Sequence, residues 1–170
     1  MRFYWPNPIT AQALTAAGWT SSRRVDITDW IDRLEGEGFH VSPPAAAILE
    51  SFGGLAIHPP EIANALWPAD PLFFDPIDVA NGMFDRYADF ESALGHRMTP
   101  LAANSSGTAF LLILDDGRVV SDSIRALWLL GNTFPQALDL LLRRHRTPYP
   151  LVGPDRFRPL IAASHHRVVG

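Results

Sequence analysis

Residues 108–120 constrain the fold more than any other part of the chain. Thr108 to Leu114 is an almost wholly apolar run of strand length, which is typical of a strand buried on both faces. Asp116-Gly117 follows shortly after, and an Asp-Gly pair between apolar segments is a strong signal for a short β-hairpin. We therefore expect the chain to return antiparallel through residues 118–120 and to form part of a covered sheet.

Further strand and turn signals surround this hairpin. Residues 98–103 favour a strand, and the Asn, Ser and Gly residues at 104–107 are typical of a turn. Residues 125–130 are ambiguous between helix and strand, and we expect a strand because Gly131 cuts the run short. Two further short strands, each bounded by prolines, are expected at 55–58 and 72–74.

The segments on either side of these strands carry helical periodicity and capping residues. Gln136 is spaced to complete a capping box, and residues 84–94 repeat apolar side chains at helical spacing before Gly95. The expected fold is α+β, with N-terminal helices packed on an antiparallel-rich mixed sheet, a C-terminal helix and an extended tail. Four residues have side chains suited to the N-cap position of a helix: Thr10, Asp26, Ser42 and Thr133.

We expect one domain followed by a tail. The chain has 170 residues, an ordinary length for a single domain, and it contains no internal repeat. The expected domain spans residues 1–146. Residues 147–170 form an extended segment that packs on the domain or trails from it, with Leu151, Phe157, Leu160 and Ile161 as the side chains that would pack.

The sequence predicts a cytoplasmic protein that has no contact with a membrane. No apolar run approaches the roughly 18 residues needed to span a bilayer. The first residues contain no apolar core of a secretion signal. We expect the protein to be a monomer.

Residue types that are absent exclude several chemistries. The chain has no cysteine, which excludes disulfides, thiolate zinc sites and cysteine nucleophiles. All 14 basic residues are arginine, so no lysine is available for a Schiff base or a phosphate-binding loop. The common catalytic and cofactor-binding motifs are also missing. We therefore expect no enzymatic activity, no cofactor and no metal.

Charge is distributed unevenly along the chain. Residues 61–95 contain seven carboxylates and one arginine, whereas residues 143–170 contain six arginines and one carboxylate. The overall net charge of −4 argues against direct binding of nucleic acid.

The acidic segment suits either a solvated surface with helix-capping aspartates or a negative surface that steers a basic partner toward the chain. Asp85, Asp89 and Glu91 are expected on the outward side of their helix. The candidate partner-binding residues, chosen from charge alone, are Asp75, Asp78, Asp85, Asp89 and Glu91, together with Asp115 and Asp116 at the hairpin.

Three other polar groups favour a structural interpretation. Residues 143–146 place cations in the last turn of a helix, where the helix dipole favours them, with phosphate binding as the alternative. His58 is expected at the edge of a strand. The adjacent residues His165 and His166 are expected in a solvated tail, because neighbouring side chains point apart and rarely share one metal ion.

Several short segments occur together in an order that resembles a known family. They are Ala16-Ala17-Gly18-Trp19, Arg23-Arg24-Val25-Asp26, Trp30, Leu34, Glu37-Gly38-Phe39, Leu49 to Leu55, Phe74-Asp75-Pro76, Leu112 to Val119, Trp128 to Gly131, and Ala137-Leu138. Over about residues 13–142, their order and spacing resemble the third subgroup of the SUKH immunity-protein superfamily. The tail, the proline-rich opening and Val120, where an aromatic residue is common, depart from that pattern.

The resemblance implies a non-enzymatic protein that protects a bacterium by binding the C-terminal domain of a cognate toxin and blocking its active surface. Family toxins are often nucleases or nucleic-acid deaminases. The shared motif residues suit the fold rather than catalysis, with tryptophans in the core and glycines at helix ends and tight turns: Gly18, Trp19, Trp30, Gly53, Gly54, Gly117 and Gly131.

Two other functions remain open from the sequence alone. One is a regulatory or scaffold protein-binding module of the same fold, whose partner is a cellular protein rather than a toxin. The other is a small hydrolase that uses Ser106 and a histidine, which would show a deep pocket and a hydrogen bond between the two side chains.

Overall fold

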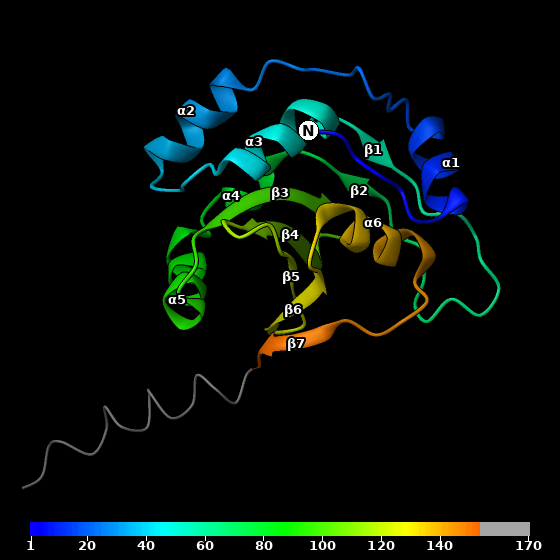
Figure 1. Cartoon of the computed structure of the whole chain (residues 1–170). Coiled ribbons are helices and arrows are strands. Elements are labelled where there is room, and N and C mark those ends of the chain that lie inside the picture. The colour runs from blue at the N-terminus through cyan, green and yellow to red at the C-terminus, as the bar shows by residue number, and fades with distance from the viewer. Residues whose placement is uncertain (154–170) are drawn as a thin grey trace, which may run out of the picture.

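The computed structural model describes residues 1–153 and contains a seven-stranded sheet in which strand order follows chain order (Figure 1). Every neighbouring pair is antiparallel, because each strand returns directly beside the one before it. The α+β fold is confirmed, and the described sheet is antiparallel throughout. The strands are β1 (Ala56–Ile57), β2 (Leu72–Phe73), β3 (Met98–Asn104), β4 (Ala109–Leu114), β5 (Val119–Ser123), β6 (Ala126–Gly131) and β7 (Tyr149–Val152).

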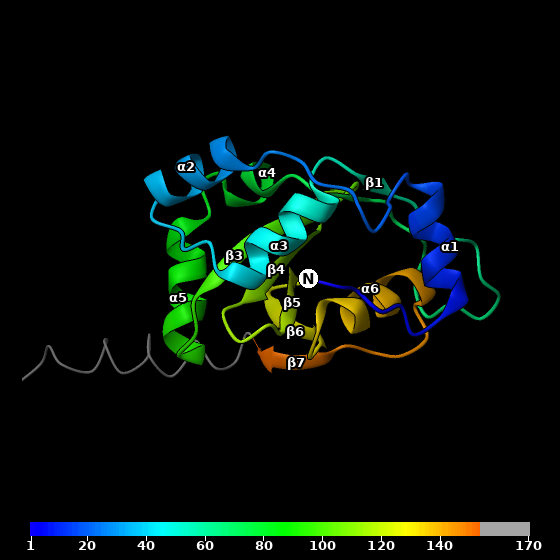
Figure 2. The same cartoon turned by 45° about the horizontal axis from the view of Figure 1, so that its top comes forward.

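Helices cover both faces of this sheet. Both views place α5 at one end of the molecule beside α2 and α4, with α1 at the opposite end (Figures 1 and 2). The helices are α1 (Pro8–Ala16), α2 (Thr28–Gly36), α3 (Pro43–Phe52), α4 (Pro76–Ala80), α5 (Phe84–Leu94) and α6 (Phe134–Arg143).

The side chains of β4 alternate between two hydrophobic clusters, one on each face of the sheet. Leu111 and Ile113 belong to the first cluster, which lies beneath α1, α3 and α6. Leu112 and Leu114 belong to the second cluster, which includes Tyr87 and other residues of α4 and α5. Because successive side chains of a strand point to opposite faces, a strand between two helical layers must be apolar at every position. The prediction of a strand buried on both faces is confirmed.

The start of α1 differs from the prediction. Pro8 occupies the first turn of the helix, and the side chain of Asn7 caps it by accepting from the N–H of Ile9 at 2.9 Å. Thr10 is therefore not an N-cap, because the helix begins at Pro8 and Asn7 occupies the cap position. Its hydroxyl is buried and donates to Asp139 of α6 at 2.9 Å, which joins α1 to α6.

Two of the other three predicted N-caps are confirmed, and at the third the cap position lies one residue later than predicted. Ser42 and Thr133 accept from backbone N–H groups at the starts of α3 and α6. Asp26 accepts from the backbone of Thr28 at 3.0 Å, although Ile27 occupies the cap position of α2. Gln136 accepts from the N–H of Asn132 rather than that of Thr133, so the reciprocal bond of the capping box reaches one residue further back.

Two arginines directly after α6 donate hydrogen bonds to backbone carbonyl groups. Arg144 is 1% exposed, and its guanidinium donates to the carbonyl of Pro60 at 2.9 Å and to that of Leu142 at 3.1 Å. Arg146 donates to the carbonyl of Leu130 at 2.7 Å. These contacts fasten the 58–71 loop and the segment directly after α6 to the body, which supports the structural interpretation of residues 143–146. His58 is exposed directly after β1.

Beyond α6, the chain adds an edge strand to the sheet. β7 pairs antiparallel with β6, and Val152 joins the second cluster. The segment predicted to be extended therefore begins as part of the sheet. Phe157, Leu160, Ile161, His165 and His166 lie outside the described residues.

The expected fold-motif residues support turns and packing. Trp19 and Trp30 are partly buried against the first cluster, and the indole N–H of Trp19 donates to Ser51 Oγ at 2.9 Å. Three of the glycines adopt positive φ angles that favour glycine: Gly18 (88°), Gly54 (78°) and Gly117 (92°). Gly53 and Gly131 are instead required by close packing, because a Cβ atom at either position would lie too close to neighbouring backbone atoms.

The turn between β5 and β6 carries residues that suit it poorly. Ile124 and Arg125 have φ angles of 50° and 56°, and this left-handed conformation costs an L-residue about 1–2 kcal/mol. We expect the double variant Ile124→Asn, Arg125→Gly to raise the free energy of unfolding by about 1–2 kcal/mol in urea denaturation. Asn64→Gly, at φ 63°, is the control and should change stability less because asparagine already tolerates this conformation. Equal stability of the double variant and the parent would contradict the prediction.

Candidate functional site

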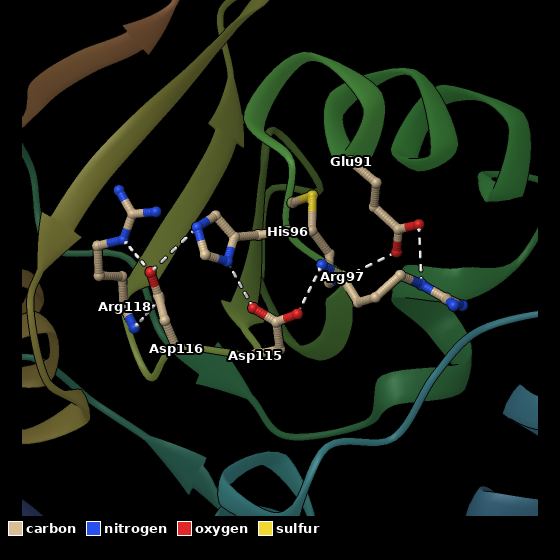
Figure 3. Close-up of polar contacts among 7 residues, drawn as sticks. Glu91, His96, Arg97, Asp115, Asp116 and Arg118 are labelled. Atoms are coloured by element: carbon tan, nitrogen blue, oxygen red, sulfur yellow. Dashed lines mark hydrogen bonds and ion pairs between the residues drawn. The ribbon is translucent and has the colours of Figure 1, made fainter.

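The carboxylates predicted to bind a partner fall into engaged and free groups. Asp115 and Asp116 lie in the β4–β5 turn and contact residues that follow α5 (Figure 3). Asp115 Oδ1 lies 2.7 Å from His96 Nδ1, and Asp115 Oδ2 accepts from the N–H of Arg97 at 3.1 Å. Asp116 Oδ2 accepts from Arg118 Nε at 2.7 Å and lies 3.6 Å from His96 Nε2. Both carboxylates therefore join the hairpin to the end of α5.

Glu91 does not point outward as predicted. Its side chain is 17% exposed, and it accepts from the backbone N–H of Met98 at 2.9 Å and lies 3.1 Å from Arg97 Nε (Figure 3). The chain reverses direction after α5, so the N–H at the start of β3 needs an acceptor, and Glu91 supplies it. The same cluster thus uses three of the predicted binding residues to close the α5–β3 connection.

Asp75 also has a structural role. Its carboxylate caps α4 and accepts from the N–H groups of Ile77 at 2.9 Å and Asp78 at 3.4 Å. Helix α4 was not predicted from the sequence, because it has only five residues and lies in a proline-rich segment. Pro76 at its first position and Asp75 at its N-cap were the available signals.

Asp78, Asp85 and Asp89 form the free group. All three are exposed on α4 and α5, and their carboxylates make no hydrogen bond or ion pair within residues 1–153. A neighbouring set on α2 and its end was missed from sequence: Asp32, Glu35 and Glu37 are exposed and likewise unpaired in the described part of the chain. The two sets, here called the acidic surface, lie on helices that share one end of the molecule (Figure 2).

Packing beneath the acidic surface holds these helices together. Leu34 of α2, Val79 of α4 and Tyr87 of α5 share the second cluster. Phe39, just after α2, packs edge-on against Phe84 with ring centroids 5.5 Å apart. Arg86 of α5 makes two bonds, of 2.8 and 2.7 Å, to the buried carboxylate of Asp122 on β5. The free carboxylates therefore lie on a rigid frame. In the sequence, the helical spacing of Asp29, Asp32 and Glu35 was the available signal that α2 carries an acidic face.

The ionisation of Asp115 couples the turn contacts to pH. The bond to His96, followed by the N–H of Arg97, lowers the pKa of Asp115 below its usual value of 3.8. A carboxyl whose pKa is lower in the folded state stabilises the fold above its unfolded pKa, and that contribution is lost as pH falls through the folded pKa. We expect Asp115→Asn to lower the free energy of unfolding at neutral pH. The difference from the parent should shrink as pH falls below 3.8, as measured by denaturant unfolding at several pH values. A constant difference across this range would contradict the prediction.

The hydrogen bond between Ser106 and a histidine that a hydrolase would need is absent from the described residues. The Ser106 hydroxyl bonds to Asp70 and Thr108 rather than to a histidine. No group of three or more His, Asp or Glu side chains between residues 1 and 153 is placed to hold a metal ion. Within the same range, no helix has the length and apolar character needed to cross a bilayer.

Comparison with known proteins places these features in a family. Residues 6–144 match the family model described as SUKH-3 immunity protein. No curated protein and no solved structure matches the chain. The matched residues include all six helices and strands β1 to β6 of the described fold.

Proposed function

Because the chain belongs to the SUKH-3 immunity protein family, we propose that it binds the C-terminal domain of a cognate bacterial toxin and blocks that domain's active surface. The toxin domain in this proposal is a nuclease or a nucleic-acid deaminase. The immunity protein acts by binding alone, as a monomer in the cytoplasm, where such a toxin would meet its substrate.

The observation that carries the proposal is the set of exposed carboxylates on α4 and α5 that have no partner in the part of the chain that the structure describes. An enzyme that acts on nucleic acid needs a basic groove, because it must neutralise the phosphates of its substrate. A surface that presents Asp78, Asp85 and Asp89 offers opposite charge to such a groove. Complementary charge increases association rates by 10–10³ and loses this effect as salt rises.

The acidic surface also suits rapid and tight binding because its frame is already folded. Ordering flexible side chains and loops at an interface costs free energy that a pre-organised surface avoids. The helices that carry the free carboxylates are fixed by the second cluster and by the bonds between Arg86 and Asp122. Asp75, Glu91, Asp115 and Asp116 support this frame, and Asp115 and Asp116 remain exposed enough to border the interface.

Calorimetric titration tests the proposal. The protein would be titrated with the catalytically inactivated C-terminal domain of a large secreted protein encoded beside its gene. We expect one-to-one binding of about −12 kcal/mol, which corresponds to nanomolar affinity. Absence of binding to that domain, together with recovery of a resident cellular complex with the tagged protein, would contradict the proposal and favour the scaffold function.

A further inference from the structure

A cavity of about 540 Å³ lies on the face of the sheet that carries the first cluster, away from the acidic surface. The 67–72 segment forms one wall, and the end of α6 with residues 147–148 forms another. Strands β4, β5 and β6 form its floor. Most of the lining is apolar, with two indole rings among it; the side chains that matter here are Trp67, Leu72, Leu111, Trp128, Leu130 and Leu141.

One polar side chain in the floor has no hydrogen-bond partner among the described residues. Ser121 of β5 is 7% exposed and lines the cavity between its sheet neighbours Leu111 and Trp128. Its hydroxyl makes no hydrogen bond to any residue from 1 to 153. The hydroxyl borders the cavity, so it is available to form a hydrogen bond with a molecule that enters.

The cavity has one charged side chain and no cationic side chain among its lining residues. Asp70 is the one ionisable side chain among its lining residues, and it is occupied by the N–H of Ser105 and the hydroxyl of Ser106. Asn104 is similarly engaged, because its amide bonds to Thr108 and to the N–H of Ala109. An anionic ligand would therefore lose its hydration without gaining an opposite charge, and a cation would meet a single carboxylate whose two oxygens already accept hydrogen bonds.

We propose that this cavity binds a small uncharged molecule with an aromatic body and a single hydroxyl or N–H group. The volume lies within the range of about 300–1,000 Å³ that is usual for small-molecule sites. The indole rings of Trp67 and Trp128 contact the ring of the ligand, and Ser121 Oγ bonds to its polar group. This site is independent of toxin binding at the acidic surface.

Titration of the ¹⁵N-labelled full chain with p-cresol tests the site, with the indole N–H signals of Trp67 and Trp128 as the readout. We expect both signals to shift saturably. Ser121→Ala should weaken p-cresol binding by about threefold to tenfold, which corresponds to loss of one hydrogen bond. The same variant should bind toluene as the parent does, since toluene has no group for Ser121. Ser92→Ala, an exposed serine on α5, is the matched control and should change neither affinity.

Three outcomes would overturn the proposal. Shifts that stay linear up to the solubility limit of p-cresol would show that no site exists. Equal affinity of the parent and Ser121→Ala for p-cresol would remove the assigned role of the hydroxyl. Displacement of p-cresol by the inactivated toxin domain, with shifts of the same indole signals, would assign the cavity to the protein interface instead of to a small ligand.

Discussion

Reversing the charges of Asp78, Asp85 and Asp89 to lysine is expected to slow association with the cognate toxin domain by roughly 10–100-fold at low salt. These carboxylates are exposed and unpaired among the described residues, so their replacement removes long-range attraction without breaking a contact. The expected effect lies mainly in the association rate and shrinks as salt rises, because exposed charges are screened over about 10 Å at 0.1 M salt. Stopped-flow fluorescence at several salt concentrations measures it.

A comparison of two single variants separates the effect of a charge's position on the association rate from the effect of net charge. Asp89→Lys and Glu61→Lys alter the net charge equally, but Glu61 is exposed in the 58–71 loop, outside the acidic surface. We expect the larger loss of association rate for Asp89→Lys. Equal rates for the two variants would contradict an interface at α5. Glu91 is left unchanged because its replacement would also remove the acceptor for the N–H of Met98.

Gly131→Ala is expected to lower the free energy of unfolding by about 3 kcal/mol, the upper part of the usual range for overpacking. A Cβ atom at Gly131 would lie 2.6 Å from the backbone nitrogen of Ala137 and 2.9 Å from Cβ of Gln136. The contact is with the first turn of α6, so relief requires the helix to shift away from β6. Denaturant unfolding followed by circular dichroism measures the loss.

Gly36→Ala provides the matched control for this substitution. Gly36 is the last residue of α2, and a Cβ atom there would meet nothing within 4 Å. Alanine is favoured over glycine in a helix by roughly 0.5–1 kcal/mol, so this variant should be slightly more stable than the parent. A loss of stability at Gly131 no greater than the change at Gly36 would show that the strand-to-helix turn tolerates a side chain.

The two sets of site residues show how far charge patterning predicts a surface. The concentration of carboxylates in residues 61–95 predicted a negative surface, and Asp78, Asp85 and Asp89 are exposed on α4 and α5. Glu91 was misplaced because its partners, Arg97 and the N–H of Met98, lie beyond the helix in the returning strand. The α2 carboxylates were missed because their proximity to α5 depends on packing between helices about 50 residues apart in sequence.

The sequence by itself determined the features that depend on neighbouring residues. The apolar run of β4, the Asp116-Gly117 turn and the caps at Ser42 and Thr133 are local, since each is decided by side chains within a few positions. The order of short segments also determined the family, which the match over residues 6–144 confirms.

Only the tertiary structure decided which polar groups are occupied and which are free. Asp122 is held by Arg86 from 36 positions away, and Thr10 by Asp139 from 129 positions away. Ser121 lines a cavity, with no side-chain partner in residues 1–153, because its two neighbouring strands and the 67–72 segment converge around it. Hydrogen bonds and ion pairs act over a few ångströms in space, so their partners are set by the path of the chain rather than by separation in sequence.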